Sequence, residues 1–195
     1  MTDLLIAAPL RLEALLIRSA VRGVPVHRTG MGPLRAQAAA RSLRKQRGNA
    51  LLVLGFCGGL DAGSKPGEVV VAEHVLAATD EGHDPHEIAC AGPETLASAL
   101  SGSGLRVRRG PVVCVSRLAL GERRAELHAG GAIAVDMESV WLSAGAGDRP
   151  FGVVRVVLDS PTHELLRPQA AAGAVRAARA LRRVAAALQE WAPGG

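Results

Sequence analysis

Three acidic residues follow two short β-branched runs in the C-terminal half of the chain. Asp136 and Glu138 come at the end of the run at 133–135, and Asp159 comes at the end of the run at 153–157. The interval between the runs is predicted to be a helix. In α/β sheets, ligand sites form outside the carboxyl ends of the strands, which is where these acids lie. Three acids in that position predict proton transfer or the binding of hydroxyl groups.

Three earlier segments also place polar groups after predicted strands. Glu13 follows a strand at 4–8 and lies in the first turn of a helix, where its carboxylate either balances the helix dipole or belongs to a site. The TGMG turn at 29–32 exposes backbone N–H groups that suit an anion or the polar edge of a ligand. The GFCGGL turn at 55–60 allows a ligand to lie against the main chain, because glycine has no Cβ.

Other chemistries lack their motifs. The three cysteines show no CxxC pair, and the Asp, Glu and His residues between 80 and 87 have neither HxxxH nor HExxH spacing. We therefore interpret 80–87 as part of a solvated loop, with a loop that covers substrate as the alternative. The chain also lacks a dinucleotide fingerprint and a Ser-His-Asp order. The sequence predicts no metal and no cofactor.

Composition indicates one domain over residues 1–195. The chain has a net charge of +5 and an isoelectric point near 10.0, but its arginines are scattered and aromatic residues are few. This pattern favours solvated helix faces over a nucleic-acid surface. An Ala- and Arg-rich helix at 169–191 is expected to pack on the sheet, with contact to an acidic membrane surface as the alternative. The odd number of cysteines and the lack of a targeting or membrane-spanning segment predict a cytoplasmic protein.

Strands and helices alternate along most of the chain. This alternation predicts a three-layer α/β fold, with a central mixed twisted sheet and helices on both faces. Strands are expected at 4–8, 24–28, 49–54, 68–75, 105–109, 112–116, 133–135 and 153–157, the pair on either side of Gly110 forming a hairpin. Helices are expected at 12–23, 34–47, 93–100, 122–129, 139–147 and 169–191.

Four blocks of sequence, in order, resemble the nucleoside phosphorylase and nucleosidase superfamily. They are TGMG at 29–32, GFCGGL with KPGEVVVA at 55–72, AVDMES at 134–139 and VVRVVLD at 153–159. This family includes purine nucleoside phosphorylase, methylthioadenosine/adenosylhomocysteine nucleosidase and futalosine hydrolase. AVDMES followed by PFGVVRVVLDSP most resembles the hopanoid-associated phosphorylase branch, whose members are thought to remove adenine from adenosylhopane.

The resemblance implies cleavage of the N-glycosidic bond of a 5′-modified purine nucleoside, with release of adenine. Asp159 matches the aspartate that protonates the purine at N7, and the apolar run before it predicts a desolvating wall; a helix-capping aspartate is the alternative. Glu138 matches the glutamate that binds the ribose hydroxyls, with Met137 packing on the sugar; a solvent-facing glutamate is the alternative. Asp136 is expected to point elsewhere, because side chains alternate along a strand.

The attacking group is either water or inorganic phosphate as a co-substrate. Glu13 lies near the family glutamate that orients water. Phosphate would instead require arginine and glycine-turn donors, for which Arg28 and Arg117 are candidates. The two Gly-rich turns add expected substrate-binding residues: Thr29, Gly30, Phe56, Cys57, Gly58 and Gly59.

The chain departs from the family pattern at Phe56 and Cys57, where many members carry a small or hydroxyl residue, and at 117–120, where an aromatic residue usually stacks on the base. Both departures suit a bulky apolar 5′ substituent, as in a lipid-linked nucleoside, and both also suit a binding homologue without activity. By resemblance, the partners are a small-molecule purine nucleoside and further copies of the chain in a homo-oligomer.

Overall fold

The computed structural model describes residues 4–79, 82–162, 170–189 and 191; the side chains of residues 79–86 are not described. Strands and helices alternate through the described residues, as the sequence predicts. The strands are β1 Leu4–Ala8, β2 Val26–Arg28, β3 Ala50–Gly59, β4 Val69–Thr79, β5 Gly82–Ala89, β6 Val107–Cys114, β7 Ala134–Asp136 and β8 Phe151–Asp159. The helices are α1 Arg11–Arg18, α2 Pro33–Leu43, α3 Pro93–Gly102, α4 Glu122–Ala129, α5 Ser139–Ser143 and α6 Ala170–Leu188.

The strands form one mixed sheet in the order β2-β1-β3-β7-β6-β4-β5, with β8 paired to both β3 and β4. β1, β2, β3 and β8 pair in parallel, so their carboxyl ends lie at one edge. The short strand β7 runs antiparallel to β3, with Val135 opposite Gly58. Asp159, the last residue of β8, is also opposite Gly58. The topology thus brings the end of β3 between the two acid-bearing strand ends.

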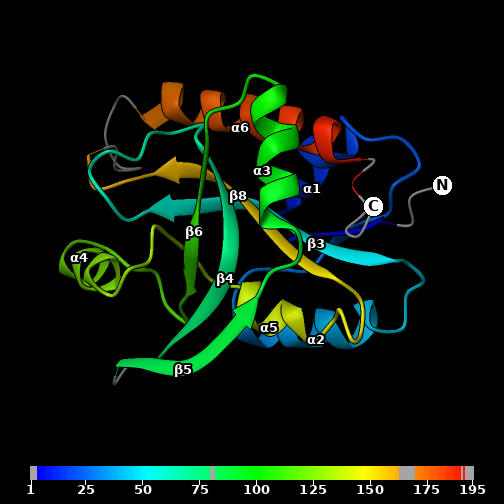
Figure 1. Ribbon diagram of the computed structural model, residues 1–195, viewed down its shortest axis with the longest axis horizontal. Helices are drawn as coiled ribbons and strands as arrows, with labels where there is room; N and C mark the ends of the chain where they lie inside the picture. The colour runs from blue at the N-terminus through cyan, green and yellow to red at the C-terminus, as the bar shows by residue number, and fades with distance from the viewer. Residues whose placement is uncertain (1–3, 80–81, 163–169, 190, 192–195) are drawn as a thin grey trace.

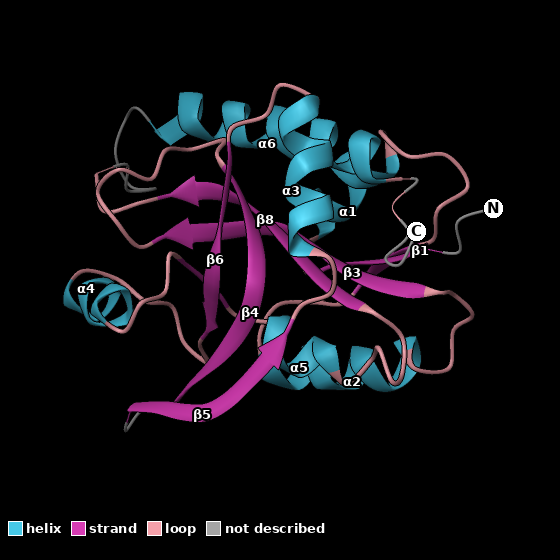
Figure 2. Ribbon diagram, in the orientation of Figure 1, coloured by secondary structure: helices cyan, strands magenta, loops and turns pink. Residues whose placement is uncertain are grey.

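Helices cover both faces of the sheet, which confirms the predicted three-layer α/β architecture. α1, α3 and α6 lie on one side and α2 and α5 on the other, while α4 lies apart beside the strand ends (Figures 1 and 2). Strands β1 and β8 are buried along almost their whole length, which is why their sequences are mostly apolar, with Arg155 as a charged residue inside β8. Among the described helices, none combines the length and apolar composition needed to span a bilayer.

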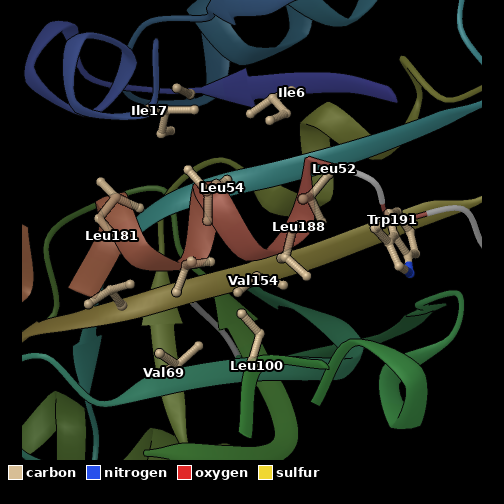
Figure 3. Close-up of a cluster of buried hydrophobic side chains, with 14 of the residues drawn as sticks. Ile6, Ile17, Leu52, Leu54, Val69, Leu100, Val154, Leu181, Leu188 and Trp191 are labelled. Atoms are coloured by element: carbon tan, nitrogen blue, oxygen red, sulfur yellow. The ribbon is translucent and has the colours of Figure 1, made fainter. Parts of the chain in front are cut away.

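Three clusters of apolar side chains fix the layers. The first joins the sheet to α1, α3 and α6 and includes Ile17, Leu100 and Leu181 (Figure 3). The second joins the opposite face to α2 and α5. The third is smaller and holds α4 through Leu127, which is fully buried among side chains such as Val113. Because α6 packs on the sheet through the first cluster, the packing expected for the C-terminal helix is confirmed.

Three local predictions are wrong. The GFCGGL segment is predicted to be a turn after a strand that ends at 54, but β3 continues to Gly59, because its last residues pair with β8 and β7. Residues 107–114 form a single strand in place of a hairpin around Gly110, because this segment pairs in parallel with β4 on both sides of Gly110, across a register shift, and its last three residues also pair with β7. The segment interpreted as part of a solvated loop contains strand β5, which pairs antiparallel with β4 from Thr79 and Gly82 onward. Its polar composition fits its place at the end of the strand order, since an edge strand has only one neighbour.

Candidate functional site

A cavity of about 570 Å³ opens at the carboxyl ends of the parallel strands. Its wall comes from the turns after β1, β2 and β8, the ends of β3 and β7, and the segment that leads into α4. The lining residues are Pro9, Leu10, Glu13, Met31, Phe56, Cys57, Gly58, Val115, Leu118, Ala119, Leu120, Gly121, Arg124, Val135, Asp136, Met137, Glu138, Leu158, Asp159 and Pro161. Glu13, Glu138 and Asp159, which come from distant parts of the sequence, thus border one cavity.

Glu13 is both a helix-terminus residue and a wall residue of the cavity. Its Oε2 accepts a hydrogen bond of 2.6 Å from the backbone N–H of Leu10, at the start of α1. Its Oε1 accepts one of 2.6 Å from the backbone N–H of Phe56, at the end of β3. Burial raises the pKa of Glu13 above its usual value, against the opposing effects of Arg155 and of these two donors. Glu13 therefore accepts a hydrogen bond at the start of α1 and also borders the cavity.

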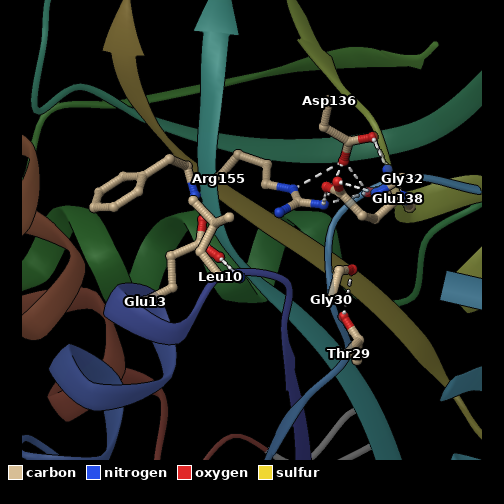
Figure 4. Close-up of polar contacts among 10 residues, drawn as sticks. Leu10, Glu13, Thr29, Gly30, Gly32, Asp136, Glu138 and Arg155 are labelled. Atoms are coloured by element: carbon tan, nitrogen blue, oxygen red, sulfur yellow. Dashed lines mark hydrogen bonds and ion pairs between the residues drawn. The ribbon is translucent and has the colours of Figure 1, made fainter. Parts of the chain in front are cut away.

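Arg155 lies in the middle of β8 and is fully buried. Its Nη2 is 2.6 Å from Oδ2 of Asp136 and 3.7 Å from Oε2 of Glu138, and its Nε donates to Asp136 at 2.9 Å. Asp136 also accepts hydrogen bonds from the hydroxyl and backbone N–H of Ser139. In Figure 4 the guanidinium points toward Asp136 and Glu138. Asp136 borders the cavity, but its side chain is fully buried in this ion pair.

Glu138 completes the cluster on the cavity side. Its Oε1 accepts a hydrogen bond of 3.2 Å from the backbone N–H of Gly32, which ends the TGMG turn. Burial raises the pKa of Glu138 to about 7, Arg155 opposes this shift, and the nearby Asp136 adds to it. By contrast, the pKa of Asp136 is lowered, because Arg155 and Ser139 outweigh its burial. Glu138 is buried, so the alternative of a solvent-facing glutamate does not hold.

One more nitrogen of Arg155 faces the Glu13 side of the cluster. Its Nη1 is buried and has no hydrogen-bond partner among the described residues. A Cβ placed on Gly55 would lie 2.6 Å from Oε1 of Glu13 and 3.0 Å from this Nη1, so the two atoms flank the same point. Glycine at this position leaves the space that the two side chains occupy. A buried donor without a partner beside a carboxylate suits a small hydrogen-bonding molecule such as water.

Asp159 forms a second ion pair, separate from that of Arg155. Its Oδ2 accepts a 2.6 Å hydrogen bond from Nη2 of Arg124, and both side chains are largely buried. The helix-capping alternative for Asp159 finds no support, because this carboxylate is paired with Arg124 on α4. The sequence predicts an apolar wall from the run before Asp159, and the structure adds a guanidinium group that lies against the carboxylate.

Apolar groups form most of the remaining wall. Phe56, Cys57 and Gly58, near the end of β3, border the cavity, as does Met137. Large apolar side chains at the border are half exposed or more: Met31 at 50%, Leu118 at 65% and Leu120 at 58%. Such exposure around a concave apolar wall is typical of a surface that receives a ligand or another molecule.

The structure does not bring every predicted residue to the cavity wall. Thr29, Gly30 and Gly59 lie outside the set of lining residues, and Gly32 is the residue of the TGMG turn that contacts an acid of the site. Arg28 and Arg117, the two candidates for a phosphate site, are also outside this set. Within the described part of the chain, no group of three or more His, Cys, Asp or Glu residues could hold a metal ion.

Sequence reasoning missed both arginines of the site. Arg155 had a usable signal, because a charged residue within a strand that is buried on both faces must have a partner. Interpreting the run at 153–158 only as an apolar wall overlooks this arginine. Arg124 had no comparable signal, because it lies in a short helix next to Arg123 and the sequence does not show which of the two faces inward.

Comparison with known proteins agrees with the fold. A family model described as the phosphorylase superfamily matches residues 15–188. The 5′-methylthioadenosine/S-adenosylhomocysteine nucleosidase of Neisseria meningitidis, in complex with methylthio-immucillin-A, superposes with a TM-score of 0.76 at 20% identity, over 98% of this chain and 100% of that one. The futalosine hydrolase of Helicobacter pylori gives a TM-score of 0.77 at 16% identity, over 96% of each chain. No curated protein sequence matches the chain.

Proposed function

Because this chain belongs to the phosphorylase superfamily, we propose that it cleaves the N-glycosidic bond of a 5′-modified purine nucleoside by hydrolysis and releases adenine. The observation that carries this proposal is the meeting of Glu13, Glu138 and Asp159 at one cavity. Cleavage passes through a sugar cation while electrons flow into the base, so the reaction needs a group that binds the ribose, a proton donor for the base and an attacking group.

Each acid suits one of these needs. Glu138, beside the Gly32 turn, would accept hydrogen bonds from the ribose hydroxyls and favour positive charge on the ring. Asp159, at the other side of the end of β3, would give its proton to the leaving base. Glu13, which borders the cavity, would orient the attacking water.

Water is favoured over phosphate by the charges at the site. A phosphate ion would have to approach near the carboxylates of Glu13 and Glu138, which would repel it. Two arginines lie near these carboxylates: Arg124 lines the cavity, and Arg155 lies behind its wall. Both are already paired with carboxylates. The structural neighbours named above are nucleosidases and a hydrolase, which supports the same choice.

The substrate proposed is an adenosine derivative with a bulky apolar 5′ group, of which adenosylhopane is the example suggested by sequence. Leu118 and Leu120, half exposed at the border of the cavity, would contact such a group as it leaves the site. Contact of the same border with a membrane surface is compatible with a lipid-linked substrate, since exposed leucines favour the interface.

Release of free base tests the proposal directly. The protein is incubated with adenosylhopane, methylthioadenosine, adenosylhomocysteine, inosine and aminofutalosine, each with and without phosphate, and the base is measured by chromatography. We expect adenine to appear without phosphate, fastest from the most apolar 5′ group, and Asp159→Asn to abolish the release while the fold is kept.

Three outcomes would contradict parts of this proposal. Release that requires phosphate would indicate a phosphorylase. Calorimetric binding of adenine without release from any substrate would indicate a nucleoside-binding protein without activity. Equal rates for all 5′ groups would remove the proposed preference for an apolar substituent.

A further inference from the structure

The ion pair between Arg124 and Asp159 lies in the wall of the cavity, where it can act on the substrate. Arg124 comes from α4 and is 4% exposed, and its Nη2 is 2.6 Å from Oδ2 of Asp159. No hydrogen bond from a described residue reaches Oδ1 of Asp159, so one carboxyl oxygen is held and the other is left for a ligand.

The position of Arg124 is specified by two neighbours as well as by its charge. Its Nε donates a hydrogen bond of 2.9 Å to the backbone carbonyl of Ala119, in the segment that lines the cavity before α4. A Cβ on Gly58 would lie 2.9 Å from Nη2 of Arg124 and 3.1 Å from the side chain of Val135. Glycine at the end of β3 therefore provides the space in which the guanidinium meets the carboxylate.

Attachment of α4 does not require this ion pair. Leu127 of the same helix is fully buried in an apolar cluster, and the preceding Arg123 pairs with Glu126 at the surface. Removing two charged groups from water has a desolvation cost that an apolar contact would avoid. The pair is therefore better explained by its place beside the cavity than by packing of the helix.

We propose that Arg124 is a positioning residue for base release, holding Asp159 toward the leaving base and stabilising the carboxylate that forms when Asp159 gives up its proton. This inference rests on the proposed nucleosidase function. It assigns a role to a residue that the sequence did not single out.

The step balances as follows. The C1′–N9 bond breaks, and its electron pair enters the purine ring. The O–H bond of the Asp159 carboxyl breaks, N7 gains the proton, and the electron pair of that bond stays on the carboxylate. Arg124 keeps all its protons, and its positive charge lies 2.6 Å from the oxygen on which negative charge develops. In the ion pair of the structure Asp159 is a carboxylate, so it must take up a proton from water before each turnover.

Two substrates with one sugar but different leaving groups test this role. The first is the best nucleoside found above, whose base must be protonated. The second carries 4-nitrophenolate at C1′, which leaves as a stable anion and needs no proton. We expect Arg124→Leu to lower kcat for the nucleoside by about 100-fold, within the range of general acid catalysis, and to leave kcat for the 4-nitrophenyl compound nearly unchanged. Arg124→Lys should restore part of the lost rate.

Arg123→Leu is the matched control, because it removes the neighbouring arginine from the surface of the same helix and should alter neither rate. Equal losses on both substrates from Arg124→Leu, with no rescue by lysine, would show a merely structural role. Unchanged rates on both would exclude any role. Thermal melting by circular dichroism verifies that each variant is folded. If the unaltered protein released no base from any nucleoside, the proposed function would itself fail, and the role of Arg124 with it.

Discussion

Two arginines form ion pairs with acids at the cavity, and their surroundings differ. Arg155 is fully buried within β8, and it contacts Asp136, Ser139 and Glu138. Arg124 lies on a short helix at the side of the sheet and contacts one carboxylate, that of Asp159. The first centre belongs to the sheet, whereas the second joins the sheet to α4.

This difference suggests a division between stability and chemistry. In the centre around Arg155, several groups share one buried positive charge, so removal of any one leaves the others without compensation. In the pair formed by Arg124, the carboxylate borders the cavity, where water can solvate it. Damage to the Arg155 centre should therefore act mainly on folding, and damage to the Arg124 pair mainly on turnover.

The largest effect is expected from Arg155→Met. The substitution leaves the buried Asp136 without its counter-charge and should lower the free energy of unfolding by about 3–5 kcal/mol. Urea denaturation measures this change. Arg117→Met, at an exposed arginine, is the control and should cost little. A loss below about 1 kcal/mol from Arg155→Met would contradict the assignment of this centre to stability.

Gly55→Ala tests the same centre by steric crowding, without the removal of a charge. The added methyl group would lie 2.6 Å from Oε1 of Glu13 and 3.0 Å from Nη1 of Arg155, both of which are held by their surroundings. We expect a loss of about 3 kcal/mol in the free energy of unfolding, at the upper end for overpacking, together with a lower kcat. Gly102→Ala is the matched control, because a Cβ there meets nothing within 4 Å. Equal stability of the two variants would show that the cluster relaxes freely.

Glu138→Gln should affect activity more than folding. Loss of a charged acceptor for the ribose hydroxyls should reduce kcat/KM by a factor of roughly thirty, or ~2 kcal/mol. Because the pKa of Glu138 is about 7, its carboxylate form is lost as the pH falls below 7, and kcat/KM should fall with it. The pH profile of the variant should lack this limb. A limb that persists unchanged would belong to Glu13, whose pKa is raised as well.

A smaller change in the free energy of unfolding than for Arg155→Met, about 1–3 kcal/mol, is expected from Arg124→Leu, because Asp159 loses a buried hydrogen-bond donor but still borders the cavity. Urea denaturation beside the Arg155→Met variant makes the comparison direct. A loss as large as that from Arg155→Met would mean that the two centres are equivalent, and the division between them would have to be abandoned.

The sequence predicted the layers of the fold because local patterns determine them. Apolar runs such as 4–8 and 153–158 are recognisable as buried strands, and a proline shortly after each run marks where it ends. The edge strand β5 escaped prediction, since its polar residues resemble a loop until the neighbouring strand is known. The single strand β6 escaped because Gly110 and Pro111 resemble a turn, whereas β4 pairs with the residues on both sides of them and keeps the chain extended.

The acids of the site could be predicted because each follows a strand, but their partners could not. Which donors reach Glu138 and Asp159 depends on how distant segments meet, and sequence spacing does not encode this for Gly32 or Arg124. The prediction of Thr29 and Gly30 as contacts shows the same limit. It placed the right turn near the site but chose residues two or three positions away from the N–H that contacts Glu138.

Cys57 lies between the two glycines that make room for the arginines, and it borders the cavity. Burial raises the pKa of its thiol far above the usual value, so the thiol keeps its proton. A thiolate in this place would compete with water for an electrophilic sugar and trap it as a thioether. In the proposed reaction, the neutral thiol lines the cavity, and the sugar intermediate can contact it without forming a bond to sulfur. For the same reason, alkylating reagents should spare Cys57 in the folded protein.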